Sequence, residues 1–123
     1  MSSYRDLEIY QLSYNLAKEV YYMTMKLPKH ELYEQGSQVR RSTQSIKDNI
    51  TEGYGRRRYK AEFVRFLVFA HSSCDEATSQ LNMINDIHFV SNPINELIES
   101  YEVLGSKIYR FIKYVEDNWK SEK

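Results

Sequence analysis

The stretch from Gln38 to Leu81 most constrains the fold, because it holds two helical patterns separated by a short basic segment. In each pattern, apolar or small residues recur at steps of three and four, which places them on one face of a helix. The first pattern consists of Val39, Thr43, Ile46, Ile50 and Gly53. The second consists of Phe63, Leu67, Ala70, Cys74, Ala77, Leu81 and Ile84. Gly53 and Gly55 interrupt the pattern between them, so the stretch predicts a helix, a hinge and a longer helix.

Two further helical patterns flank this pair, and turn residues set their limits. Pro28 should end the first helix, Ser37 is a suitable N-cap for the second, and Asn92 followed by Pro93 suits the start of the fourth. We expect helices at about residues 6–27, 37–55, 59–87 and 93–119. No strand pattern competes, so the chain of 123 residues predicts one all-α domain, an antiparallel up-down-up-down four-helix bundle.

Positive charge is concentrated around the hinge. From Arg40 to Arg65 there are eight Lys or Arg and three acids, a local charge of +5 in a chain of formal net charge zero. From Phe66 to Ser106 there are six acids and no Lys or Arg. The basic residues are Arg40, Arg41, Lys47, Arg56, Arg57, Arg58, Lys60 and Arg65. The charge is therefore strongly polarised along the sequence.

Aromatic residues next to this charge favour RNA as a ligand. Tyr54 and Tyr59 flank the three consecutive arginines, so the hinge offers cations for phosphates and rings on which unpaired bases stack. The alternative is a solvated charged turn, since short basic runs are common on protein surfaces.

Two helices carry more apolar surface than one bundle core needs. In the first, a stripe of Ile9, Leu12, Leu16, Val20, Met23 and Leu27 suits the core. A second stripe lies about 135° away on a helical projection and contains Leu7, Tyr10, Tyr14, Ala17, Tyr21 and Met25. Phe66 and Phe69 similarly flank the core face of the third helix. These flanks are either buried on two sides within the chain or cover a contact with another subunit.

Signatures of catalysis, cofactors and metals are weak. His71, Cys74 and Asp75 have a spacing that suits a metal, but Cys74 lies within an apolar stripe and no fourth ligand is evident. We therefore expect a non-enzymatic protein without cofactor or metal. No apolar run is long enough for a membrane span, the N-terminus lacks a signal-peptide core, and the single cysteine suits a reducing compartment. We expect a cytoplasmic protein without membrane contact.

The motifs resemble a known family. They include Leu27-Pro28, Glu31, Gln38-Val39-Arg40-Arg41, Ser45-Ile46, Asn49-Ile50, Glu52-Gly53-Tyr54-Gly55-Arg56, Glu62-Phe63, Phe66-Leu67, Ala70, Ser73, Glu76 and Gln80-Leu81. This pattern resembles the four-helix-bundle proteins of 23S rRNA intervening sequences, often labelled S23-type. The family is in turn similar to the accessory variability protein of diversity-generating retroelements, a basic pentameric barrel that binds nucleic acid and a reverse transcriptase.

The resemblance implies an antiparallel bundle that assembles into a homopentameric ring without catalysis. The doubled stripes agree with such an assembly, in which Leu7, Tyr10, Tyr14, Tyr21, Phe66 and Phe69 form the subunit interface. Polar positions shared with the family should form a buried or interfacial hydrogen-bond set, namely Ser45, Asn49, Glu52, Ser73 and Glu76. Two functions remain open: RNA binding through the basic residues, or a protein-interaction scaffold in which those residues serve solubility or subunit pairing.

Overall fold

The computed structural model describes residues 2–121, which are helical throughout apart from short connectors. The four long helices are α1 (Glu8–Thr24), α3 (Gln35–Gly55), α4 (Lys60–His88) and α5 (Asn95–Asn118). A 3₁₀ turn, η1 (Tyr4–Asp6), precedes them, and a single helical turn, α2 (Lys29–Leu32), lies between α1 and α3. The described residues contain no strand, which confirms the predicted all-α class. None of their helices combines the length and the apolar character that a membrane span requires.

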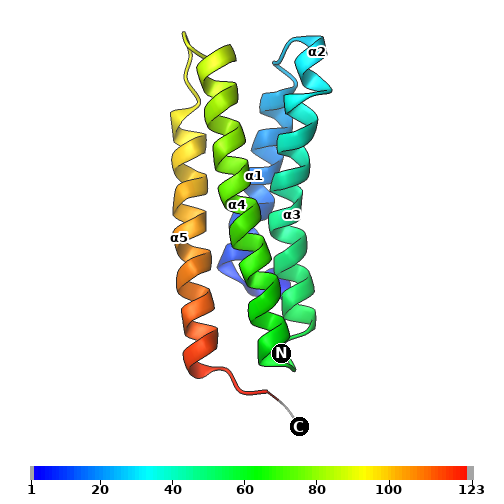
Figure 1. Ribbon diagram of the computed structural model, residues 1–123, viewed down its shortest axis with the longest axis vertical. Helices are drawn as coiled ribbons and strands as arrows, with labels where there is room; N and C mark the ends of the chain where they lie inside the picture. Colours follow the sequence, from blue (N-terminus) through cyan, green and yellow to red (C-terminus); the bar gives the residue numbers. More distant parts are fainter. Residues whose placement is uncertain (1, 122–123) are drawn as a thin grey trace.

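The long helices form a four-helix bundle around one core. Helix α1 packs against α3 and α5, and α4 packs against the same two helices. Figure 1 shows the α3–α4 connector at one end of the bundle and the α4–α5 connector at the other. The hinge therefore lies at the end opposite α2.

The predicted core faces of α3 and α4 are confirmed. All seven residues of the α4 pattern are buried, and so are all five of the α3 pattern. In α1, every residue of the first stripe is buried except Leu12, which is half-buried. Local helical periodicity thus identifies the core face of these three helices correctly.

Several helix ends differ from the prediction because turns use hydrogen bonds that the sequence does not reveal. Helix α1 ends at Thr24, and residues 25–27 continue as tighter turns with bonds from each amide to the third preceding carbonyl. The Pro28 carbonyl accepts from the amides of Glu31 and Leu32, both at 2.9 Å, which creates α2 in the predicted connector. Neither of the predicted N-caps, Ser37 and Asn92, occupies that position. Helix α3 begins two residues before Ser37, and the N-cap of α5 is Ile94.

Helix α3 runs through Gly53, so the hinge is shorter than the glycines suggested. Gly53 is buried where α3 approaches α4: a Cβ there would lie 3.1 Å from Phe66 Cβ and 3.3 Å from the Phe63 carbonyl oxygen. Gly55 ends the helix, and nothing lies within 4 Å of the position of its Cβ. The first glycine permits close packing, and the second marks the helix end.

This difference predicts opposite effects for the same substitution. Gly53→Ala should destabilise the fold by about 1–3 kcal/mol, because the added methyl group meets a backbone atom that cannot easily move. Gly55→Ala should stabilise it by about 0.5 kcal/mol through helix propensity. Urea denaturation of both variants measures the difference, and equal stabilisation by the two would contradict the close approach at Gly53.

Candidate nucleic-acid interface

The hinge, residues 56–59, is a tight turn held by both ends of the chain. The Arg56 amide donates to the carbonyls of Glu52 and Gly53, and the Tyr59 amide donates to the Arg56 carbonyl at 3.0 Å. From the C-terminal side, the Trp119 indole N–H donates to the Arg57 carbonyl at 2.9 Å. The hinge is therefore a fixed element at one end of the bundle (Figure 1).

Two further contacts tie the chain ends to the residues around the hinge. The Ser121 hydroxyl accepts from the Lys60 amide at 2.9 Å, and the Ser2 and Tyr54 hydroxyls are hydrogen-bonded to each other. These contacts join residues that lie more than 50 positions apart in the sequence.

Arg56 and Arg65 form a layer of guanidinium groups over two phenylalanine rings. Arg56 binds Glu52 at 2.8 Å and Glu62 at 3.0 Å, and it lies 4.8 Å from the centre of the Phe66 ring. Arg65 lies 5.5 Å from the Phe66 ring and 5.2 Å from the Phe69 ring. The hydrogen bond that Arg56 donates to the Glu52 carboxylate raises the pKa of Arg56, so this group stays cationic at every relevant pH.

Tyr54 does not have the predicted stacking role. Its side chain is 6% exposed, because Arg57 covers one face at 4.1 Å and Phe63 packs edge-on against the ring. Arg57 also donates to the Tyr54 carbonyl at 2.9 Å, so it supports the turn. Tyr59, by contrast, is 54% exposed beside Arg58 and remains available to a base.

The structure does not bring the other predicted cations to the hinge. Arg40 turns inward and donates to the Thr24 hydroxyl at 2.9 Å and to the Leu32 carbonyl at 3.1 Å. Arg41 donates to Ser37 near the start of α3. Arg40 lies on α3 and Arg56 directly follows the end of this helix, so the 16 residues that separate them correspond to about 24 Å along the helix axis. The eight basic positions therefore do not form one patch.

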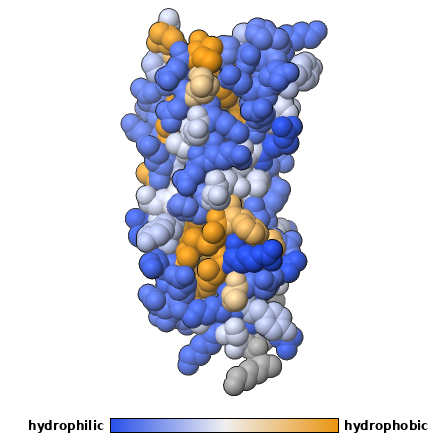
Figure 2. Space-filling view, in the orientation of Figure 1, coloured by the Kyte–Doolittle hydropathy of each residue, from blue (hydrophilic) through white to orange (hydrophobic). Residues whose placement is uncertain are grey.

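The predicted interface residues also lie on two separate flanks. Tyr14 and Tyr21 of α1 are exposed on the side of α3, and Leu7 and Tyr10 are half-buried against the core. Phe69 is 41% exposed on α4, and Figure 2 shows apolar side chains gathered over the lower part of the face where α4 lies in front. Each flank therefore keeps exposed aromatic side chains, Tyr14 and Tyr21 on one and Phe69 on the other.

The predicted polar set assembles between α3 and α4, with one exception. The Ser45 and Ser73 hydroxyls share a hydrogen bond of 2.9 Å, and the Asn49 amide donates to the Ser45 carbonyl. Glu76 accepts from Ser42 at 3.0 Å, a partner that the sequence pattern does not indicate. The exception is Glu52, which binds Arg56 instead.

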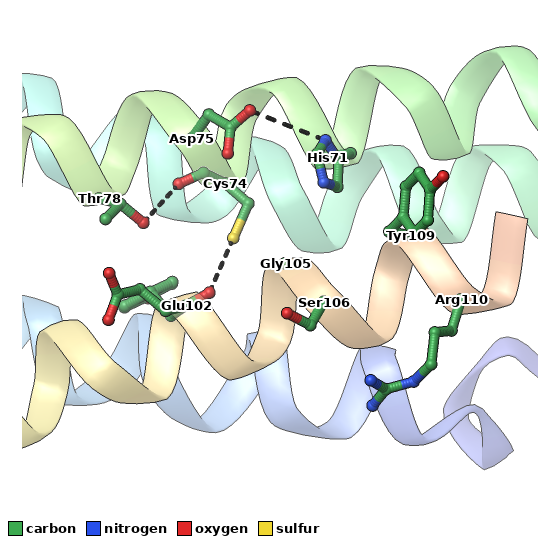
Figure 3. A pocket seen from close by; sticks show the side chains of 10 residues that line it. His71, Cys74, Asp75, Thr78, Glu102, Gly105, Ser106, Tyr109 and Arg110 are labelled. Carbon is green, nitrogen blue, oxygen red and sulfur yellow. Dashed lines mark hydrogen bonds and ion pairs between the residues drawn. The ribbon is translucent and has the colours of Figure 1, made fainter.

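A cavity of about 480 Å³ lies between α4 and α5. His71, Cys74 and Asp75, the three residues considered as metal ligands, line it (Figure 3). His71 and Asp75 are 3.8 Å apart, whereas the Cys74 thiol donates to the Tyr101 carbonyl at 3.2 Å. Burial, followed by the charge of Asp75, raises the pKa of Cys74 to about 12. Residues 2–121 contain no group of three potential ligands close enough to hold a metal ion. At neutral pH this thiol is therefore neither a nucleophile nor an anionic ligand.

Comparison with known proteins adds a family assignment. No curated protein matches the chain significantly. Residues 5–110 match the family model described as 23S rRNA-intervening sequence protein. This match covers the four long helices except the end of α5, the hinge and the polar set between α3 and α4. The chain therefore belongs to the family of 23S rRNA-intervening sequence proteins.

Proposed function

We propose that this protein is a non-enzymatic, oligomeric RNA-binding protein that contacts RNA through the hinge end of its bundle. The observation that carries the proposal is the cluster of exposed arginines and aromatic rings there, in a chain whose family is named for an rRNA insertion. We further propose an antiparallel bundle, which the short connectors support, and a ring of five copies in the cytoplasm.

The chemistry of the cluster suits a single-stranded or locally unpaired RNA. Guanidinium groups held over Phe66 and Phe69 present planar donors to phosphate oxygens, and exposed Tyr59 offers a stacking surface. From Glu52 to Arg65 there are five Lys or Arg and two Glu, a local charge of +3. One such patch binds weakly, and several copies in a ring add their contacts through avidity.

A protein-interaction scaffold is the second candidate. It is favoured by the apolar surface beside the cluster, where Val68 is 48% and Phe69 41% exposed. An exposed apolar patch of this kind is typical of a protein-binding surface. The guanidinium groups that lie over Phe66 and Phe69 are instead typical of an RNA-binding surface. Removing the arginines distinguishes the two candidates, because RNA binding requires their charge to meet phosphates, whereas an apolar contact with a protein partner does not.

The deciding experiment removes three hinge cations while keeping Arg57, which supports the turn. The variant Arg56→Ala, Arg58→Ala, Arg65→Ala should bind single-stranded RNA and fragments of 23S rRNA more weakly. Each lost phosphate contact should reduce the slope of log affinity against log salt by about 0.7. Fluorescence of the single tryptophan, Trp119, should report RNA binding directly, because its indole is bonded to the hinge.

The matched control removes the same charge from the opposite end of the bundle, with Lys26→Ala, Lys29→Ala and Arg41→Ala. It should keep the affinity and the salt slope of the parent. If both variants lose equal affinity, the binding is a non-specific response to charge. If neither changes the affinity, or the parent binds no RNA near 0.1 M salt, the scaffold function replaces RNA binding.

A further inference from the structure

Helix α1 is flanked by two grooves of opposite charge. The basic groove, between α1 and α3, has a volume of about 250 Å³, and three cations but no acid line it: Lys18, Arg40 and Lys47. Tyr14 and Tyr21, 44% and 48% exposed, provide its apolar surface. The hydrogen-bond partners of Arg40 are neutral groups, so its charge is not cancelled there. Only Lys47 has an acidic neighbour, Asp48, at 2.7 Å.

The acidic groove lies on the other side of α1, against α5, and has a volume of about 680 Å³. Four carboxylates and one lysine line it: Glu8, Glu19, Glu96, Glu99 and Lys107. Lys107 binds Glu8 at 3.3 Å, and within residues 2–121 the other three carboxylates make no ion pair. Leu12 and Val103 add apolar surface, and Val103 is 52% exposed. The two grooves are therefore complementary in charge, and both combine charge with apolar side chains.

The positions of the grooves suit a contact between copies of the chain. Lys18 lines the basic groove and Glu19 the acidic groove, and consecutive helical residues differ by only about 1.5 Å in height. A contact between the grooves thus needs little shift along the bundle, as a closed ring requires. The grooves flank one corner of the bundle and are separated by roughly a quarter turn. Because the grooves are two different faces set at an angle, a contact between them is heterologous, and such a contact closes into a ring when the rotation between copies closes and otherwise gives an open filament.

We propose that the acidic groove of one copy docks onto the basic groove of the next copy. The inference rests on the homo-oligomer of the proposed function and assigns its contact surfaces. Tyr14 and Tyr21 lie in the contact, as expected from their stripe, and Lys18 and Lys47 face the carboxylates of the neighbouring copy. Phe66 and Phe69 lie outside it, so this contact leaves the hinge cluster exposed for RNA.

Charge reversal tests the contact. The pair Lys18→Glu, Lys47→Glu makes both grooves acidic, and the pair Glu19→Lys, Glu99→Lys makes both basic. Each pair alone should reduce the mass measured by light scattering at micromolar concentration to that of a single chain. The combination of all four changes should restore the parental mass, because opposite charges face each other again. Lys29→Glu with Lys113→Glu, two exposed positions outside the grooves, should keep the parental mass.

Each other outcome overturns the proposal. If the Lys18, Lys47 pair keeps the parental mass, the basic groove is not the subunit contact; if that variant also loses RNA affinity, the groove binds RNA. If the four-fold variant stays a single chain while circular dichroism shows intact helices, the two grooves do not meet. A monomeric parent refutes both this contact and the proposed oligomer, whereas loss of RNA binding in the hinge variant leaves the contact intact.

Discussion

Phe63→Ala is expected to destabilise the protein by about 3–5 kcal/mol, because it leaves a large cavity at a position that cannot collapse. Phe63 is fully buried at the start of α4. Its ring packs edge-on against Tyr54, Phe111 and Trp119, with centroid distances of 6.0, 5.9 and 5.2 Å. The residue thus joins the end of α3, the end of α5 and the base of the hinge. Chemical denaturation followed by circular dichroism measures the loss.

Phe69→Ala is the matched control for this prediction. It truncates the same side chain on the same helix at a position that is 41% exposed, so its loss should stay below about 1.5 kcal/mol. The Phe63 variant should also change the emission of Trp119, because it removes the ring that positions the indole. A similar loss for the two variants would mean that the hinge does not depend on this aromatic cluster.

The core could be predicted from the sequence because it depends on local periodicity. The α4 face is the clearest case: seven positions at steps of three and four all prove buried. The same reasoning separated the two stripes of α1 and left Tyr14 and Tyr21 for a surface outside the core. Within a helix, spacing alone fixes which side chains share a face.

The site was harder to predict because its geometry depends on distant contacts. The sequence predicts that the Tyr54 ring is available to a base. In the fold, however, Ser2, Arg57 and Phe63 contact this side chain. Arg40 belongs to a basic run in sequence, but Thr24 and the Leu32 carbonyl hold it at the other end of the bundle. Basic residues close in sequence therefore did not identify a patch. The ion pair between Arg56 and Glu62 likewise depends on the turn between α3 and α4, which brings the two residues together.

The grooves beside α1 illustrate the same limit in a different way. The sequence predicts different functions for Lys47 and Tyr21: RNA binding for Lys47 and a subunit contact for Tyr21. They line the same groove because α1 and α3 pack side by side. Under the proposed docking of one copy onto the next, both residues have the same role, in the contact between subunits.

The Cys74 thiol is expected to react with a disulfide reagent at pH 8 about a thousandfold more slowly in the folded protein than in the unfolded chain. Burial and the neighbouring Asp75 raise its pKa from 9.0 to about 12, and a shift of three pH units lowers the thiolate fraction by about this factor. The thiol proton is also engaged, since it is donated to the Tyr101 carbonyl at 3.2 Å. Comparing modification rates in buffer and in concentrated guanidinium measures the ratio, and similar rates would show that the thiol is accessible.

The same pKa shift makes the free energy of unfolding depend on pH in the alkaline range. In the unfolded chain the thiol ionises near pH 9, whereas in the fold it stays protonated up to about pH 12. Ionisation therefore favours the unfolded chain: stability should be unaffected below pH 9 and should fall as the pH rises from 9 to 12. Burial raises the pKa of Tyr101 in the same direction, so Cys74→Ala should remove only part of this decline. A pH series of urea denaturation on both proteins tests this, and identical slopes would show that Cys74 does not contribute.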